Sequence, residues 1–319
     1  MKLVTNIDKM FNLIVALFFI FSTSCSFQKI ENKNILRLGF MPNVTHATAL
    51  IGIEKNIFQD ELGGNIKFKP IHFVVGNSII DAFITRQIDV AYIGPGPFIN
   101  AVYRKIPIQL LANAANGGTV LVGALHAMPL QGGSRIAVPQ YGNTQDLILR
   151  SYLIKNNLSN KVQIFAIPPQ DTGTAFFTMS IDAACLPEPW GTILIEKGIC
   201  NLLVDEKQIL NNGSYPVTLL VVNKEYAKNN IKIIKNLLSA HNKANSFIDN
   251  NPLEAIKIAA KAISNISKKE IDKEIIAKSM KRCVFNSELD LNILKQFQEI
   301  GVKAGYYKKG FIGNEDWFN

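Results

Sequence analysis

The chain has 319 residues, of which 48% are hydrophobic and 18% are charged, and its formal net charge is +9. This length allows a large core and more than one lobe, and this composition excludes an intrinsically disordered chain. No basic run is interleaved with aromatic residues, so nucleic-acid binding is not expected. The 4 cysteines and 4 histidines show neither zinc-ligand spacing nor a redox motif. We therefore expect neither a bound metal nor a cofactor.

The first 24 residues are typical of an export signal. Lysines precede an apolar stretch from Phe11 to Phe21, which is shorter than the about 20 residues that a membrane span needs. Cys25 follows three small residues and resembles the lipid-bearing first residue of a mature bacterial lipoprotein. Ser22 departs from that pattern, in which an aliphatic residue is usual, so an ordinary secretory signal is the alternative. We expect a signal peptide (1–24), a lipidated Cys25 and a short polar tether (25–34).

Strand and helix patterns alternate in the next part of the chain. Apolar runs predict strands at 35–40, 66–71, 89–94 and 108–114, and amphipathic spacing predicts helices at 46–56 and 78–86 and a further helix opened by Pro97. Such alternation is typical of βαβ units in a mostly parallel sheet. We assign residues 35–118 to the first part of lobe I.

A second α/β unit lies between two long apolar strands, 119–125 and 216–222. Within it, the patterns predict strands at 135–138, 162–167 and 182–186 and helices at 144–156, 173–180 and 190–197. We expect this unit to be lobe II (119–222), inserted into lobe I, with the two long strands as crossovers and hinge. Helical patterns at 231–250, 253–263, 269–282 and 289–304 are expected to complete lobe I (223–319) and to carry little chemistry.

An internal repeat relates the two lobes. The run from Thr85 to Ile93 shares Thr, Ile, Asp and Ala positions with the run from Thr178 to Leu186, and a proline-rich turn follows each. The strands at 35–40 and 135–138 also each lead to a threonine-bearing helix start. Helix starts present unpaired N–H groups and the positive end of the dipole. Two such ends facing each other suit a small polar or anionic ligand.

Five short motifs resemble those of the type II periplasmic solute-binding proteins, within the branch that binds nitrate, sulfonates, taurine and thiamine-pathway pyrimidines. They are Leu38-Gly39-Phe40, Asn43-Val44-Thr45-His46-Ala47, Ile88-Asp89-Val90-Ala91-Tyr92-Ile93-Gly94-Pro95, Gly142-Asn143-Thr144-Gln145-Asp146 and Pro187-Glu188-Pro189-Trp190. The resemblance is dense from Leu36 to Trp190, and it implies two α/β lobes with a ligand cleft between them. Cys185 departs from it, since a larger residue is common there, and the sequence leaves a Cys185–Cys200 disulfide open.

The resemblance also implies a function. We expect a monomeric, non-catalytic binding protein that is exported and anchored to the membrane by lipid. It would deliver a small anionic or sulfonate-like solute to the permease and ATPase of an ABC importer. One alternative is import of a thiamine-type pyrimidine or another heterocycle. A pyrimidine-synthesis enzyme on the same fold is a further alternative, which the export signal and the missing cysteine cluster disfavour.

Fourteen residues near strand ends are candidate ligand contacts. They are Asn43, Thr45, His46, Tyr92, Gly94, Pro95, Gly96, Asn116, Gly117, Gly142, Asn143, Thr144, Glu188 and Trp190. Helix capping is the alternative role for Thr45 and Thr144. His46 would donate to an anionic oxygen, more strongly when protonated. Glu188 would bind a ligand amine or pair with a donor near the hinge, and Trp190 would stack on a ligand or fill the seam between lobes.

Overall fold

The computed structural model describes residues 34–125, 129–308 and 317–318. The chain divides into two compact units, Met1–Asn34 and Ile35–Asn319, and the second has its own hydrophobic core. Cys25 lies outside the described residues, so its lipidation remains a prediction. Within the described part of the chain, no helix is long and apolar enough to cross a membrane.

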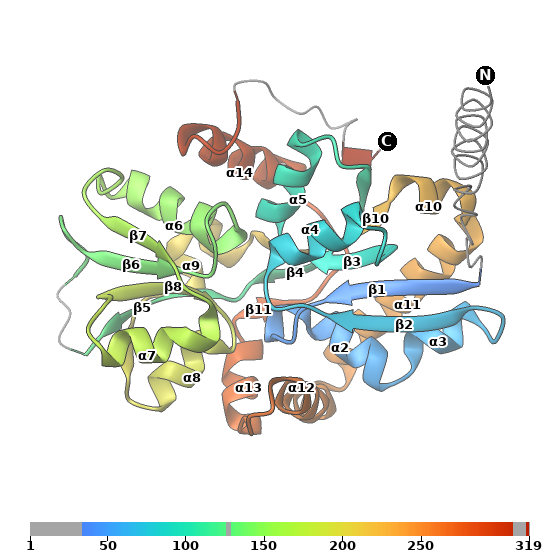
Figure 1. Cartoon of the computed structure of the whole chain (residues 1–319). Helices are drawn as coiled ribbons and strands as arrows, with labels where there is room; N and C mark the ends of the chain where they lie inside the picture. Colours follow the sequence, from blue (N-terminus) through green and yellow to red (C-terminus); the bar gives the residue numbers. More distant parts are fainter. Residues whose placement is uncertain (1–33, 126–128, 309–316, 319) are drawn as a thin grey trace, which may run out of the picture. The chain divides into compact units, whose positions relative to one another are not determined.

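Two sheets form the framework of the second unit, as Figure 1 shows. The first, in the order β11-β4-β10-β3-β1-β2, contains β1 (Ile35–Phe40), β2 (Lys67–His72), β3 (Val90–Ile93), β4 (Ile108–Gly117), β10 (Pro216–Asn223) and β11 (Cys283–Val284). The second, in the order β7-β6-β8-β5-β9, contains β5 (Thr119–Ala124), β6 (Arg135–Val138), β7 (Gln163–Ala166), β8 (Ala183–Pro187) and β9 (Cys200–Val204). We call the part around the first sheet lobe I and the part around the second lobe II. The expected end of lobe II at residue 222 needs correction, because β10 lies in the first sheet between β3 and β4.

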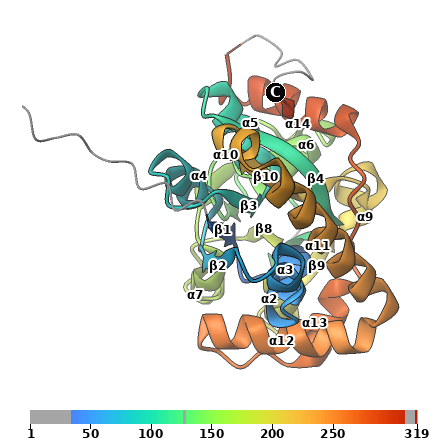
Figure 2. The same ribbon diagram turned by 90° about the vertical axis from the view of Figure 1, so that its right-hand side faces the viewer.

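Helices flank both sheets (Figures 1 and 2). They are α2 (Ala47–Glu54), α3 (Ile57–Leu62), α4 (Gly76–Ile84), α5 (Pro95–Tyr103), α6 (Thr144–Lys155), α7 (Thr172–Phe177), α8 (Trp190–Glu196), α9 (Glu206–Ile209), α10 (Lys224–Asn229), α11 (Ile231–Asn250), α12 (Pro252–Ser267), α13 (Lys273–Met280) and α14 (Leu291–Lys303). Short 3₁₀ turns lie at Val44–His46, Pro169–Asp171 and Asn211–Gly213. Helix α11 packs against α2 and α3, and α14 packs against α5 and α6.

The sheets mix parallel and antiparallel pairing. β1 is parallel to β2 and β3, and β6 is parallel to β7 and β8. β10 is antiparallel to β3 and β4, and β5 is antiparallel to β8 and β9. The predicted α/β fold with two helix-flanked sheets is confirmed. The expectation of mostly parallel pairing needs correction, because the long strands β5 and β10 each run against both of their neighbours.

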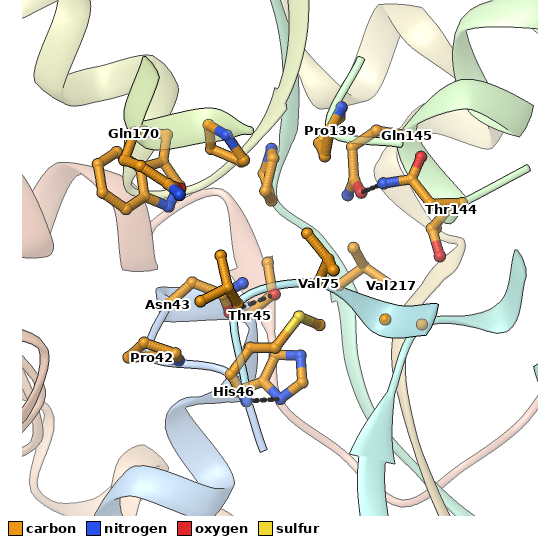
Figure 3. Close-up of a pocket in the computed structure, with 18 of the residues that line it drawn as sticks. Pro42, Asn43, Thr45, His46, Val75, Pro139, Thr144, Gln145, Gln170 and Val217 are labelled. Carbon is orange, nitrogen blue, oxygen red and sulfur yellow. Dashed lines mark hydrogen bonds between the residues drawn. The ribbon is translucent and has the colours of Figure 1, made fainter. Parts of the chain in front are cut away.

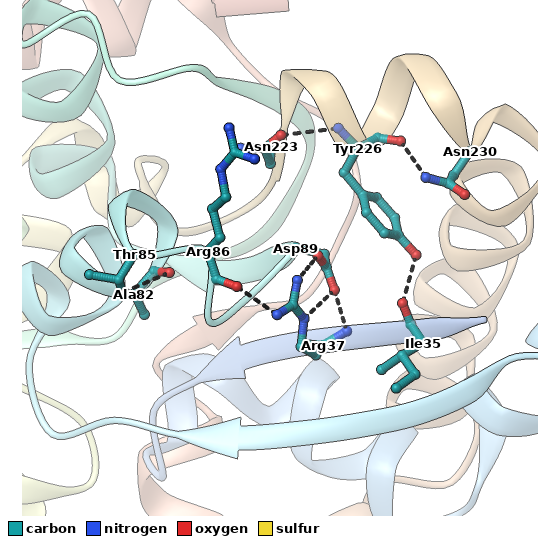
Figure 4. Close-up of polar contacts among 9 residues, drawn as sticks. All are labelled: Ile35, Arg37, Ala82, Thr85, Arg86, Asp89, Asn223, Tyr226 and Asn230. Carbon is teal, nitrogen blue, oxygen red and sulfur yellow. Dashed lines mark hydrogen bonds and ion pairs between the residues drawn. The ribbon is translucent and has the colours of Figure 1, made fainter. Parts of the chain in front are cut away.

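The internal repeat is visible in matching polar contacts of the two lobes, and Figure 4 shows those of lobe I. In lobe I, the backbone N–H and Nε of Arg37 donate to Asp89 Oδ2 at 2.8 and 2.9 Å, and Nη2 donates to Oδ1 at 2.6 Å. In lobe II, Arg135 makes the same three bonds to Asp182, at 2.7, 3.1 and 2.7 Å. The first pair ties β1 to the start of its parallel neighbour β3, and the second ties β6 to the start of its parallel neighbour β8. The repeated sequence therefore builds the same βαβ arrangement twice.

The three described cysteines, Cys185, Cys200 and Cys283, are free thiols. β5 lies between the strands that carry the first two, pairing Leu121 with Cys185 on one edge and Ala124 with Cys200 on the other. The intervening strand keeps these two sulfurs apart, so the disulfide that the sequence left open is not formed.

Candidate ligand-binding site

A cavity of about 290 Å³ lies between the two lobes (Figure 3). Lobe I contributes the segment after β1, the start of α4 and the end of α12, while lobe II contributes the start of α6 and the residues after β6 and β8. Most of the lining is apolar and includes five prolines, at positions 42, 97, 139, 169 and 187. Because several of the lining segments directly follow parallel strands, the cavity lies beyond the carboxyl ends of these strands, where open α/β sheets bind ligands.

Half of the fourteen predicted contacts reach this cavity. Those that line it are Asn43, Thr45, His46, Gly94, Asn143, Thr144 and Trp190. Those that do not are Tyr92, Pro95, Gly96, Asn116, Gly117, Gly142 and Glu188.

His46 is buried beside the cavity and is neutral. Its Nδ1 accepts the backbone N–H of Met41 at 3.3 Å, which assigns the ring proton to Nε2. Burial lowers the pKa of His46 to about 3. The stronger, protonated donor is therefore not the form present at neutral pH, because the desolvation cost of the charged ring dominates. A neutral His46 can still donate one hydrogen bond from Nε2.

Asn43 and Thr45 hold each other in place. The Thr45 hydroxyl donates to Asn43 Oδ1 at 2.9 Å, and the Asn43 side chain makes no capping bond to the 3₁₀ turn that follows it. The amide nitrogen of Asn43 has no hydrogen-bond partner among the described residues. That N–H₂ group and His46 Nε2 are thus lobe I donors available to a ligand.

At the start of α6 the cap is Asn143 rather than Thr144. Asn143 Oδ1 accepts the backbone N–H of Asp146 at 2.9 Å, and Asn143 Nδ2 donates to Gln145 Oε1 at 3.2 Å. The Thr144 hydroxyl instead accepts the Gly96 N–H of lobe I at 3.3 Å, so its own proton remains available to donate.

The turn after β3 makes a contact between lobes instead of wrapping an oxyanion. A Cβ atom on Gly94 would lie 2.2 Å from Thr144 Oγ1, and one on Gly96 would lie 2.6 Å from the Asn143 carbonyl carbon and 2.7 Å from Gly142 O. This correction applies to Gly96 and Gly142, whose backbones approach each other too closely to leave room for a ligand. Pro95, the first residue of α5, does not line the cavity.

We expect Gly96→Ala to force the lobes apart, because the added methyl group meets backbone atoms that cannot rotate away. Overpacking of this kind costs about 1–3 kcal/mol, or about a fivefold to 150-fold loss of affinity for any solute held by both lobes. Small-angle scattering should show a larger radius of gyration. Gly64→Ala is the control, since nothing lies within 4 Å of its Cβ position. An unchanged radius and affinity in Gly96→Ala would contradict the contact.

Tyr92, Asn116 and Gly117 belong to the core and the crossover. Tyr92 is fully buried, with its hydroxyl 2.8 Å from His241 Nδ1, because β3 alternation turns it toward α11 and away from the cavity. Asn116 Oδ1 accepts from Asn113 Nδ2 at 3.2 Å. Gly117 has φ +74°, and a Cβ there would lie 2.5 Å from Arg282 O. All three are corrected from ligand contacts to structural residues.

Glu188 takes the structural role that the sequence offered as its alternative. It is fully buried and accepts from the Thr192 N–H at 3.1 Å, the Thr192 hydroxyl at 2.9 Å and the Ser279 hydroxyl at 3.1 Å. Arg282 Nε lies 3.2 Å from Glu188 Oε1, and Arg282 Nη1 lies 2.9 Å from Glu206 Oε2. Burial raises the pKa of Glu188, and these donors oppose that shift. The Glu188 carboxylate therefore bonds to donors of the protein itself and does not face a ligand.

Trp190 lies at the seam between the lobes and also borders the cavity, so its position is compatible with both of the roles considered for it. It is half-buried, lines the cavity, and packs against the hydrophobic clusters of both lobes. A ligand that enters the cavity meets the indole on a wall that also seals the seam.

Sequence reasoning missed several lining residues, and Lys269 is the most consequential. It follows α12 and is the one lysine or arginine among the described residues that line the cavity, and no aspartate or glutamate lines it. The last third of the chain, which we expected to carry little chemistry, thus contributes a charged side chain to the cavity wall at this loop. Gln170, which follows β7, could have been found from the strand-end rule. No sequence signal marks Lys269.

Comparisons with known proteins agree with this architecture. The taurine-binding periplasmic protein of Escherichia coli (strain K12) is 24% identical over 184 residues, which are 56% of this chain and 56% of that protein. The chain thus spans about half the length of the curated relatives it matches. The alkanesulfonate-binding protein SsuA from Xanthomonas axonopodis pv. citri, solved bound to MOPS, superposes with a TM-score of 0.73 at 16% identity, covering 86% of this chain and 95% of that one.

A second solved structure, the periplasmic nitrate-binding protein NrtA from Synechocystis PCC 6803, superposes with a TM-score of 0.76 at 16% identity, covering 89% of this chain and 84% of that one. These likenesses show a shared periplasmic-binding-protein fold, as the motifs implied. The NMT1-like family matches residues 29–264, which is most of the sequence. The chain therefore belongs to the NMT1-like family.

Proposed function

We propose that this protein is a non-catalytic, exported binding protein that captures a small anionic solute and delivers it to an ABC importer. The observation that carries the proposal is the charge of the cavity wall. Lys269 lines it, and no acidic side chain does so among the described residues. A wall with this balance favours a negatively charged or neutral solute over a cation.

The polar groups support an oxyanion as the head group. Donors from both lobes border the cavity: the Asn43 amide, His46 Nε2, the Thr144 hydroxyl and the start of α6. Helix starts favour anions through their free N–H groups and dipole. The prolines and Trp190 would contact an organic remainder, which suits a sulfonate-like solute better than a bare inorganic ion. Relatives named for taurine, alkanesulfonates and nitrate agree with this class.

A pyrimidine or other heterocycle is a weaker candidate on this structure. Trp190 could stack on a ring, but Glu188 is bonded to Thr192, Ser279 and Arg282 and cannot accept from an exocyclic amino group. An enzyme on this fold would need positioned acid–base groups with a pKa near the working pH, whereas burial lowers the pKa of His46 to about 3 and its Nδ1 already accepts from the Met41 N–H.

Titration calorimetry with taurine, simple alkanesulfonates, nitrate and an aminopyrimidine tests the proposal. For an anionic solute, we expect Lys269→Gln to weaken binding about tenfold or more, since a charged hydrogen bond contributes about 1.5–3 kcal/mol. Lys268→Gln is the matched control, because Lys268 is exposed and outside the cavity lining. Binding of the aminopyrimidine alone, or equal effects of both variants, would contradict the anionic proposal.

We expect Trp190→Ala to weaken the binding of an organic anion by about 2 kcal/mol or more, which is about thirtyfold. The physical reason is that the indole would cover the apolar part of the solute and exclude water from it. The expected loss for nitrate is smaller, because nitrate has no apolar part to cover the ring. Calorimetry on Trp190→Ala and Trp190→Phe, with circular dichroism as the folding control, measures both. Equal losses of affinity for nitrate and for a sulfonate would show that Trp190 affects binding only through the packing between the lobes, not through contact with the solute.

We also propose that Cys25 carries the lipid that holds the protein at the membrane, as the apolar run and small residues before it indicate. Cys25→Ala should move the protein from the membrane fraction to the soluble fraction of cells, and mass spectrometry of the N-terminal peptide should lose the lipid mass. Unmodified Cys25 in the wild-type protein would support the ordinary secretory signal instead.

A further inference from the structure

We propose that the end of lobe I where its parallel strands begin is a docking surface for anionic lipid headgroups. This end lies opposite the cavity and is defined here by Lys67, Lys105, Lys224, Lys228, Ile231 and Lys232, which we call the basic end. Figure 2 looks onto it, with the starts of β1 and β2 and helix α10 toward the viewer. The proposal does not depend on the identity of the solute.

The contacts of β1 hold part of this surface together. Ile35, the first residue of β1, pairs with Lys67 at the start of β2, and its carbonyl accepts from the Tyr226 hydroxyl of α10 at 3.2 Å (Figure 4). On the other side, the Lys224 N–H donates to the Pro107 carbonyl at 2.8 Å, which brings α10 beside Lys105. Segments far apart in sequence thus bring their lysines to one end of the sheet.

In the described part of the chain, the positive charges of these five lysines are not balanced by acidic side chains in ion pairs. No ion pair involves any of the five among the described residues. Nearby acids have cationic partners, since Glu225 lies 3.4 Å from Arg86 and Asp89 is bonded to Arg37. Clusters of about four to eight Lys or Arg side chains are typical of surfaces that bind anionic lipids.

An exposed apolar side chain lies within the cluster. Ile231 begins α11, between Lys228 and Lys232, and is 63% exposed. Surfaces that bind membranes combine lysines with a protruding apolar residue, which enters the boundary between headgroups and acyl chains. An exposed isoleucine among these lysines is not expected on a surface that only contacts water.

The point at which the chain enters the folded unit favours a membrane, rather than another polyanion, as the partner of the basic end. The chain enters the folded unit at Ile35, beside Lys67 of the basic end, and nine residues lie between Cys25 and Ile35. An anchored Cys25 would keep this end within about 35 Å of the lipid, from about 3.3–3.6 Å per extended residue. β1 then runs six residues, about 20 Å, to the cavity side, so docking at the basic end leaves the cavity in water.

Vesicle sedimentation of the chain from Ser26 onward tests this, since the compact unit begins at Ile35. We expect binding to phosphatidylglycerol vesicles, weak binding to phosphatidylcholine vesicles, and loss of binding as salt rises. Replacing Lys67, Lys228 and Lys232 by glutamine should weaken binding about 100-fold, from about fivefold per lysine. Replacing Lys257, Lys261 and Lys273 of the α12–α13 region, which are also exposed, is the charge-matched control.

Ile231→Ser separates lipid insertion from attraction to any polyanion, because it leaves the charge unchanged. We expect it to weaken vesicle binding about tenfold and to leave binding to heparin unchanged. The proposal is overturned if the two triple variants lose binding equally, if both vesicle types bind equally, or if Ile231→Ser binds like the wild type. Solute titration in the same variants should match the wild type, so a failure here is distinct from a failure of the proposed function.

Discussion

Replacing Arg282 by methionine is expected to destabilise the protein by about 3–5 kcal/mol, because it leaves a buried carboxylate without its cation. Glu188 is fully buried, and Arg282 contacts both it and Glu206, at 3.2 and 2.9 Å. The hydroxyls of Thr192 and Ser279 continue to donate to Glu188 but carry no charge. Urea denaturation at neutral pH measures the change, and a lower midpoint at constant slope would locate the effect in stability.

Two further variants identify the cause. Lys278→Met removes a cation from the nearby exposed pair with Glu196 and should cost at most about 1 kcal/mol. Glu188→Gln combined with Arg282→Met should recover part of the loss, because the charge at Glu188 is gone while Glu206 still lacks its cation. A single Arg282→Met variant as stable as Lys278→Met would show that Glu188 is not ionised in the folded protein.

Much of the fold could be predicted from the sequence, because periodicity and the internal repeat are local signals. The strand at 35–40 and the helix at 231–250 are confirmed at their stated ends. Other elements were missed for physical reasons. β11 is only two residues long, and α9 only four, so neither shows a period. The exposed and buried residues of β9 do not alternate clearly, so the sequence shows no strand pattern there.

The site could be predicted only in part, because sequence position does not fix which side of a strand end a residue faces. Thr144 and His46 were found from strand-to-helix transitions, and both line the cavity. Tyr92 follows the same rule but faces the core, and Glu188 was placed beside Trp190 without knowledge that Arg282 meets it. Lys269 reaches the cavity through the packing of distant helices, which no local pattern encodes.

The buried histidines should make the protein acid-labile well above the pKa of its carboxylates. Burial lowers the pKa of His46 to about 3 and that of His241 to about 4, from 6.5. His241 contacts the Tyr92 hydroxyl and Asn245, neither of which carries a compensating negative charge. Below the unfolded value, the unfolded chain therefore binds more protons than the folded one, so stability falls as pH falls.

The expected loss is about 2 kcal/mol per histidine between pH 7 and pH 5, at about 1.4 kcal/mol per pH unit below 6.5, and about 4 kcal/mol for both. Denaturation at the two pH values measures it. His241→Gln should reduce the drop by about 2 kcal/mol whatever its own stability at pH 7, and His46→Gln should do the same. Gly64→Ala is the control, since it changes no ionisable group and nothing lies within 4 Å of its Cβ position, and its drop should equal that of the wild type. Because the readout is a difference between two pH values in one variant, packing defects cancel. Equal drops in all four proteins would mean that the buried rings are solvated well enough to titrate as they do in the unfolded chain.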